Sequence, residues 1–198
     1  AGNDLIRWPI VADFDRDGHL IVAESGGVAS PIAEHNEKGV HKIVRLIDDD
    51  RDGTYDRRQV VADGLAFPQG VLCFGDSIYV GVPPRILKLT DADGDGVCEQ
   101  RTTWFDGGSL TDCANDVHGP YLGRDGWLYW TKGGFGKQTH PLADGRVMTS
   151  DASHIYRRRP DASPLAPLDP LIAGGMDNPV ELAFTPEARI PDPAERAR

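Results

Sequence analysis

Two stretches of the sequence carry acidic residues at the spacing of a calcium loop. The stretches "DDDRDGTYD" at 48–56 and "DADGDGVCE" at 91–99 each place an acid at positions 1, 3, 5 and 9 and a glycine at position 6. The glycine permits a sharp turn, and hard oxygen ligands at this spacing can converge on one Ca²⁺. The predicted ligands are Asp48, Asp50, Asp52 and Asp56 in the first stretch and Asp91, Asp93, Asp95 and Glu99 in the second.

The residues around these loops exclude an EF-hand and favour a β-hairpin. An EF-hand needs a bidentate Glu at position 12, where this sequence has Gln59 and Thr102. The flanking runs, "HKIVRL" and "PRILKL" before the loops and "RRQVVADG" and "RTTWFDG" after them, are rich in the β-branched and aromatic residues that favour strands. Each loop is therefore predicted at the tip of a hairpin, with calcium binding favoured over a merely solvated acidic turn. A partial match at 13–18 has Ile21 at position 9 and is interpreted as a plain hairpin turn.

The two loops belong to a longer repeat. Five pairs of positions fall into register 43 residues apart, namely Ile43 with Ile86, Arg45 with Lys88, Asp48 with Asp91, Asp63 with Asp106 and Gly64 with Gly107. A third copy at 155–174 lacks the acidic cluster. A second kind of hairpin pattern precedes each copy, at 9–24, 68–82 and 119–133. Four short strands per repeat of about 40 to 60 residues are typical of a β-propeller blade.

The repeat predicts an all-β fold, because no long stretch has helical periodicity. The expected fold is a β-propeller of four-stranded blades. Its predicted segments are blades at 9–67, 68–117 and 118–178, the start of a fourth blade at 179–190, and an irregular end at 191–198. Since three blades would leave open sheet edges, we expect this chain to be part of a larger propeller.

Composition excludes several classes of function. The net charge of −10 argues against a nucleic-acid partner, because phosphate binding needs clustered Lys and Arg. The one basic run, Arg157–Arg159, is interpreted as a solvated strand face. No apolar stretch approaches the length of a membrane span. The three cysteines form no Cys-x-x-Cys pair, which excludes a zinc ribbon.

A second set of residues is predicted to share one face of the propeller. In this fold, the loops before each innermost strand and after each second strand surround the central channel, where ligands bind. The residues at these places are Trp8, Glu24, Gln69, Arg85, His118, Lys132 and Asn178. The loop "GGSLTDCANDVHG" before the third blade is longer than its counterparts, and such insertions often mark binding loops. Near its end lies His118, a candidate general base whose imidazole Asp116 could orient.

Several ordered motifs resemble a known family. "VADFDRDGHLIVAE", "RLIDDDRDGTYD", "KLTDADGDGVCE", "NDVHGPYLGRDGWLYW" and "GGMDNPVELAFTPE" together are similar to the propeller of membrane-bound dehydrogenases of planctomycete type. These are related to soluble quinoprotein glucose and sorbosone dehydrogenases. The resemblance covers the chain up to about residue 187.

The resemblance implies a six-bladed propeller in the periplasm or outside the cell. It further implies calcium and the cofactor pyrroloquinoline quinone (PQQ), a sugar or alcohol substrate, and a cytochrome c electron acceptor. The amide and cationic side chains expected to ring the quinone are Gln69, Arg85, Lys132 and Asn178. His118 and Asp116 would then be the catalytic residues of a dehydrogenase, with His118 assisting hydride or proton abstraction.

Two alternatives stay open from the residues alone. The chain could be a non-catalytic, calcium-stabilised propeller that binds carbohydrate or protein. It could also be a lactonase or other hydrolase with a metal in the channel. A serine hydrolase has no support, because no Gly-x-Ser-x-Gly elbow is present.

Overall fold

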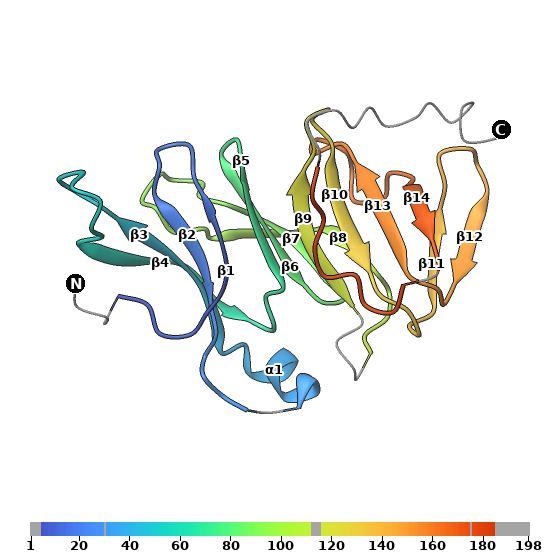
Figure 1. Cartoon of the computed structure of the whole chain (residues 1–198), viewed down its shortest axis with the longest axis horizontal. Helices are drawn as coiled ribbons and strands as arrows, with labels where there is room; N and C mark the ends of the chain where they lie inside the picture. Colours follow the sequence, from blue (N-terminus) through green and yellow to red (C-terminus); the bar gives the residue numbers. More distant parts are fainter. Residues whose placement is uncertain (1–4, 30, 112–115, 175, 185–198) are drawn as a thin grey trace.

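The computed structural model of the chain describes residues 5–29, 31–111, 116–174 and 176–184. Within these ranges the protein is built from antiparallel sheets (Figure 1), so the predicted all-β class is confirmed. The first four-stranded sheet contains, in order, β1 (Pro9–Phe14), β2 (Leu20–Glu24), β3 (His41–Ile47) and β4 (Arg57–Leu65). The second contains β5 (Gly70–Phe74), β6 (Ser77–Val82), β7 (Arg85–Thr90) and β8 (Gln100–Asp106).

The third four-stranded sheet has an insertion. It contains β9 (Val117–Leu122), β10 (Leu128–Lys132), β13 (His154–Arg158) and β14 (Asp169–Ala173). A separate hairpin of β11 (Gln138–Pro141) and β12 (Val147–Ser150) is inserted between β10 and β13. No pattern in the sequence predicted this hairpin.

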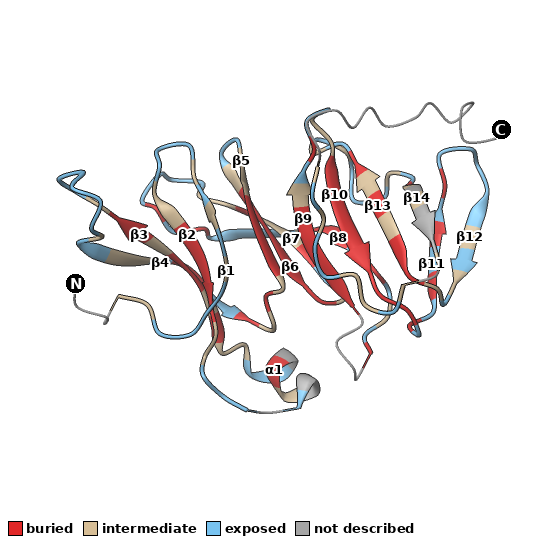
Figure 2. Ribbon diagram, viewed as in Figure 1, coloured by how far each residue is buried: buried red, intermediate tan, exposed pale blue. Residues whose placement is uncertain are grey.

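The three sheets stack face to face in chain order. Successive residues of a strand point to opposite faces of its sheet, so the second sheet can pack against a neighbour on each side. Val71 packs with Ile21 and Ile43 in a core that joins the first sheet to the second. Its neighbour Leu72 packs with Leu128 and Trp130 in a separate core that joins the second sheet to the third. Figure 2 shows the buried residues concentrated on the strands where the sheets face one another. The second sheet is therefore apolar on both faces.

The second and third sheets approach each other closely at three glycines. A Cβ atom on Gly70 or Gly81 would lie 2.1 or 2.3 Å from the carbonyl oxygen of Gly119. Both distances are far below van der Waals contact, so only glycine fits at 70 and 81. This contact brings the start of β5 and the end of β6 against the start of β9.

The two ends of the strands have different loops. The turns within the hairpins β1–β2, β3–β4, β5–β6 and β7–β8 lie at one end, and the connections between hairpins lie at the other (Figure 1). One connection contains α1 (Ile32–Lys38), a short helix that ends at Gly39 with φ 54°. The Nδ1 of His35 in α1 lies 2.8 Å from the Nε2 of His41 in β3, which ties the helix to its sheet.

The predicted C-terminal segments are only partly described. Residues 179–184 form no strand, although a fourth blade was expected to begin there. Residues 185–190 and the end at 191–198 lie outside the described residues. Among the helices of the described ranges, none is long and apolar enough to cross a membrane.

Candidate metal loops and candidate active-site residues

Both predicted calcium loops lie at hairpin tips, as expected. Residues 48–56 connect the antiparallel strands β3 and β4, and residues 91–99 connect β7 and β8. Both tips are at the turn end of the strands, away from the connections that hold α1 (Figure 1).

The position-1 carboxylates shape the two loops in the same way. Asp48 accepts a hydrogen bond from the backbone N–H of Gly53 at 2.8 Å, and Asp91 accepts one from Gly96 at 2.8 Å. The two glycines have φ of 88° and 91°, a conformation that side chains with a Cβ rarely adopt. The glycine at position 6 is therefore required by the backbone in both loops.

The position-9 acids close the loops in matching fashion. Asp56 accepts a hydrogen bond from the N–H of Asp49 at 2.7 Å, and Glu99 accepts one from the N–H of Ala92 at 3.0 Å. Each acid is thereby held opposite the start of its own loop, so the loops are pre-formed rather than extended.

The carboxylates of each loop converge. One oxygen from each of Asp91, Asp93, Asp95 and Glu99 lies within 4.8 Å of the others. In the first loop the same is true of Asp48, Asp50 and Asp56, whereas Asp52 lies outside the group. Of the eight predicted ligands, seven are therefore placed where they could hold a metal ion together.

A third group of possible metal ligands lies in the turn whose sequence was interpreted as a plain hairpin turn. Asp15, Asp17 and His19 in the β1–β2 turn also bring ligand atoms within 4.8 Å of one another. The Nε of Arg45 lies 3.3 Å from Asp15, which already compensates one negative charge. The turn is a hairpin turn, as interpreted from sequence, and the Asp-x-Asp-x-His spacing was the signal for its additional ligand group.

The residue at position 12 of the first loop links the two loops. The side-chain amide of Gln59 donates a hydrogen bond to the backbone carbonyl of Asp95 at 2.9 Å. Position 12 thus contacts the neighbouring loop, whereas in an EF-hand it would bind the ion of its own loop.

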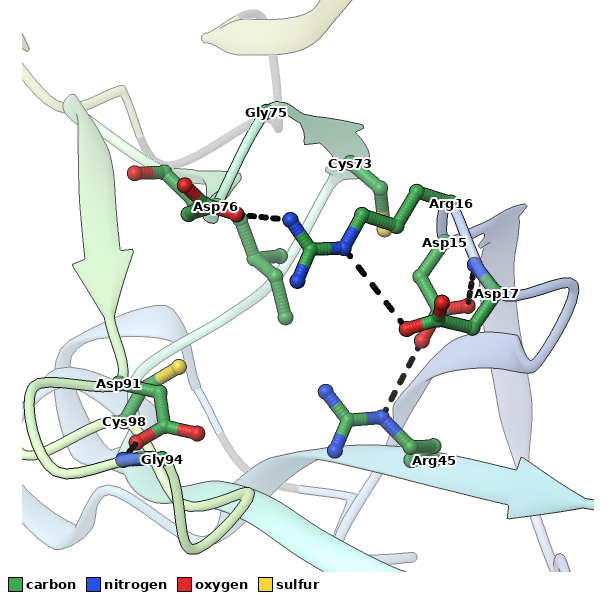
Figure 3. Close-up of a pocket in the computed structure, with 12 residues that line it drawn as sticks. Asp15, Arg16, Asp17, Arg45, Cys73, Gly75, Asp76, Asp91, Gly94 and Cys98 are labelled. Carbon is green, nitrogen blue, oxygen red and sulfur yellow. Dashed lines mark hydrogen bonds and ion pairs between the residues drawn. The ribbon is translucent and has the colours of Figure 1, made fainter.

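A pocket of about 330 Å³ lies beside the second loop, between the first two sheets (Figure 3). Two ion pairs, Arg45 with Asp15 and Arg16 with Asp76, compensate charge on its walls. Burial raises the pKa of Cys73 to about 12 and that of Cys98 to about 11. Both thiols are therefore protonated near neutral pH and are poor nucleophiles.

At the opposite end of the strands, the predicted catalytic residues lie in two pairs. The Nε2 of His118 lies 3.2 Å from the Oδ1 of Asn178. The Nζ of Lys132 lies 3.5 Å from the Oδ1 of Asp116, and both side chains are buried. The Asp116 carboxylate also accepts hydrogen bonds from the backbone and hydroxyl of Thr111. Among the described residues, the side chain of Asp116 thus contacts Lys132 and Thr111. Its place beside His118 in the sequence had instead predicted that it orients the His118 ring.

The other two predicted cofactor residues lie at the same end, with Arg85 at the start of β7 and Gln69 directly before β5. Arg85 is exposed and its Nε lies 3.3 Å from Asp106 of the adjacent strand. The backbone N–H of Gln69 donates a hydrogen bond to the carbonyl oxygen of Gly81 at 2.7 Å. Because Gln69 precedes Gly70, which contacts Gly119, it lies close to the start of β9.

The remaining two channel-face residues belong to the first sheet. Glu24 is buried, and its carboxylate lies 2.9 Å from the Nη2 of Arg58. Trp8 is 54% exposed, with its ring against Gly27. Glu24 therefore serves as an ion-pair partner within its own sheet.

Comparison with known proteins identifies a family. Residues 1–169 match the model of a family described as a domain of unknown function, DUF7133. Among solved structures, regucalcin from Agrobacterium tumefaciens strain C58, described as a calcium-binding protein, is similar at 14% identity and a TM-score of 0.43. The similarity covers 87% of this chain and 64% of that protein's chain. No curated protein matches the sequence.

Proposed function

We propose that this chain, which belongs to the DUF7133 family, is a propeller-type β-domain that binds Ca²⁺ at its two acidic hairpin loops. The observation that carries the proposal is the second loop, where oxygens of Asp91, Asp93, Asp95 and Glu99 lie within 4.8 Å of one another. Four carboxylates at this separation repel one another unless a cation lies among them.

The arrangement of the sheets supports the propeller. Three four-stranded antiparallel sheets, packed face to face in chain order, are what consecutive blades require. The six-blade count comes from the family resemblance, and further sheets would have to come from a longer protein.

Calcium is proposed to stabilise the fold. Hard carboxylate and carbonyl oxygens suit Ca²⁺, and an ion that binds only the folded state stabilises it by mass action. At a concentration 100-fold above Kd this contribution is about 2.7 kcal/mol. For a chain of this size, that corresponds to a rise in Tm of roughly 5 to 10 °C.

Thermal unfolding in calcium, in magnesium and in a chelator tests the proposal. We expect the Tm to be higher in calcium than in the chelator, with a smaller rise in magnesium, which prefers fewer carboxylates and tighter octahedral geometry. The difference in Tm between calcium and chelator should vanish in a variant carrying Asp48→Asn, Asp50→Asn, Asp91→Asn and Asp93→Asn. The control Asp151→Asn changes an exposed acid outside the loops and should respond like the unmodified protein. Equal Tm values in calcium and chelator would refute calcium binding.

A second candidate function is dehydrogenase-like chemistry at the opposite end of the strands. The observation that favours it is the gathering of His118, Asn178, Lys132 and Asp116 at one end of the third sheet. A dehydrogenase of this kind would act on a sugar or alcohol and pass electrons to a cytochrome c. It would work in the periplasm or outside the cell. The non-catalytic binding module and the metal-dependent lactonase remain its competitors.

The described residues fit PQQ poorly. The carboxylates of PQQ need uncompensated cations, but Arg85 is paired with Asp106 and Lys132 with Asp116. We therefore derive no reaction step through PQQ. A spectroscopic titration of the chain with PQQ and calcium tests the fit, and saturable binding that His118→Ala or Lys132→Met abolishes would restore the dehydrogenase assignment. If turnover is then found, His118→Ala should lower it about 100-fold or more if His118 is the general base.

A further inference from the structure

Arg158 is a cation buried between the second and third sheets. Its side chain is 3% exposed, although it ends the strand β13. Its guanidinium carbon lies 4.3 Å from the ring centre of Trp104 and 5.9 Å from that of Trp130. Stacking on these rings offsets part of the cost of burial. The stacked rings contact only the flat face of the guanidinium. They give its N–H groups no acceptor, because these groups point outward in the plane of the group.

One edge of this guanidinium has no acceptor. Nη1 donates to the carbonyl of Pro164 at 3.1 Å, whereas Nε and Nη2 are buried without a hydrogen-bond partner in the described part of the chain. An unsatisfied buried donor costs free energy, and the cost is larger when the group is charged. An acceptor at this edge would therefore gain more than one at an exposed arginine.

Two other arginines of the same chain show what this edge binds. Nε and Nη2 of Arg57 lie 2.7 and 3.0 Å from the two carboxylate oxygens of Asp49. The same two nitrogens of Arg157 lie 2.8 Å from an oxygen of Asp169. A planar carboxylate matches the paired donors of this edge.

Arg158 lines a pocket of about 180 Å³. The other walls are mostly apolar and include Phe105, Pro164, Ala166 and Leu168. His140 contributes a buried Nε2, which also has no hydrogen-bond partner among the described residues. The pocket therefore combines an apolar wall with Arg158 and His140, whose unpaired nitrogens are buried beneath its surface. An apolar wall with a few polar groups is typical of ligand sites.

The charge balance favours a ligand with a single negative charge. Burial lowers the pKa of His140 to about 4, so this ring is neutral near pH 7. Asp106 also lines the pocket, but its carboxylate is paired with Arg85 at 3.3 Å. The guanidinium of Arg158 is thus the uncompensated charge of the pocket, and a dianion such as phosphate would bring an excess of negative charge toward Asp106.

We propose that this pocket binds a small monocarboxylic acid, with the carboxylate on Arg158 and the hydrocarbon part against Phe105 and Leu168. Nε and Nη2 are buried, so the acid reaches them only if a neighbouring segment is displaced. The turn at 163–166 is such a segment, because its Pro164 carbonyl binds Nη1 of the same guanidinium. Leu165 of the turn is 87% exposed, so little packing opposes the displacement. The pocket volume limits the acid to a few carbon atoms.

Titration of the complete chain with butyrate tests this assignment, with tryptophan fluorescence as the readout because Arg158 lies over two tryptophan rings. We expect saturation at millimolar butyrate, as suits a ligand of few atoms. Butyramide has the same shape without the charge and should bind at least about tenfold more weakly, since a charge-assisted hydrogen bond is about twice as strong as a neutral one. Inorganic phosphate should also bind more weakly than butyrate.

Three variants locate the site. Arg158→Lys keeps the charge but removes the paired donors, and should weaken butyrate binding about tenfold or more. Ala166→Leu fills the pocket without touching Arg158, and serves if Arg158→Lys fails to fold. Arg159→Gln removes the adjacent, exposed guanidinium and should leave binding unchanged.

Four results would overturn the proposal. These are the absence of saturable butyrate binding, equal binding of butyramide, tighter binding of phosphate, and an unchanged butyrate affinity in Ala166→Leu or in folded Arg158→Lys. A loss of binding in Arg159→Gln equal to that in Arg158→Lys would place the carboxylate elsewhere.

Discussion

Three consecutive arginines divide between two opposite faces of the third sheet, and strand geometry explains why. Arg157 and Arg159 both stack on Trp127, with guanidinium carbons 4.6 and 4.5 Å from its ring centre. Arg158 points to the opposite face and is buried on Trp104, because alternate residues of a strand face opposite ways. The interpretation of 157–159 as a solvated strand face is therefore wrong for Arg158. A run of like residues in a strand has to be divided by face before its exposure is predicted.

At the residue scale, His140 should make stability depend on pH. It is 7% exposed, and burial lowers its pKa from 6.5 to about 4. Between these pH values the unfolded chain binds a proton at this residue that the folded protein does not. The stabilising effect of the neutral ring is thus fully present above pH 6.5 and is lost as the pH falls toward 4. The loss should be on the order of 3 kcal/mol.

Urea unfolding at pH 7 and at pH 4.5 measures this effect. The unmodified protein should lose more stability between the two pH values than His140→Leu does, because the variant lacks the titrating ring. Identical losses in the two proteins would show that His140 does not titrate abnormally.

At the element scale, the two acidic hairpin loops share a backbone but differ in charge. The first loop carries Arg51 and is followed by Arg57, which binds Asp49 at 2.7 Å. The second loop has Gly94 and Gln100 at the corresponding positions. It also brings four acids together, whereas the first brings three. Local charge therefore favours a cation more strongly in the second loop.

We expect the second loop to bind Ca²⁺ about tenfold more tightly than the first, since affinity follows the number of charged ligands. Calorimetric titration of two double variants resolves the loops. Asp91→Asn with Asp93→Asn should remove the tighter binding event, and Asp48→Asn with Asp50→Asn should remove the weaker one. Loss of the tighter event in the second variant would reverse the assignment.

At the scale of the whole molecule, the sheets depend on close backbone contacts as well as on apolar cores. A Cβ atom on Gly81 would lie 2.3 Å from the carbonyl oxygen of Gly119. This oxygen belongs to the backbone and has little room to move. The second and third sheets are therefore held at a distance that one added methyl group would disturb.

Gly81→Ala should destabilise the protein by about 1–3 kcal/mol or more, because overpacking forces the backbone to shift. The matched control is Gly134→Ala, whose added Cβ would find its nearest neighbours at 3.7 Å. Urea midpoints of the two variants measure the difference. Equal urea midpoints would mean that the second and third sheets move apart to fit the added methyl group without loss of stability.

The sequence by itself determined the all-β class and the placement of both acidic loops at hairpin tips. Both are local properties, because strand alternation and loop spacing depend on residues close together along the chain. The sequence also predicted that His118 lies near the start of one strand and Lys132 at the end of another. It did not predict the helix α1 or the hairpin β11–β12, whose segments are short and lack a clear period.

Only the tertiary structure decided which groups are partners. Asn178 meets His118 across 60 residues, and Gln59 meets Asp95 across 36. The packing of the second sheet on the third likewise decided that Arg158 is buried on Trp104 without an acceptor for one edge of its guanidinium. These contacts depend on which faces of separate sheets come together, and that is set by the packing of side chains over the whole domain, which the spacing of residues in any one strand does not encode.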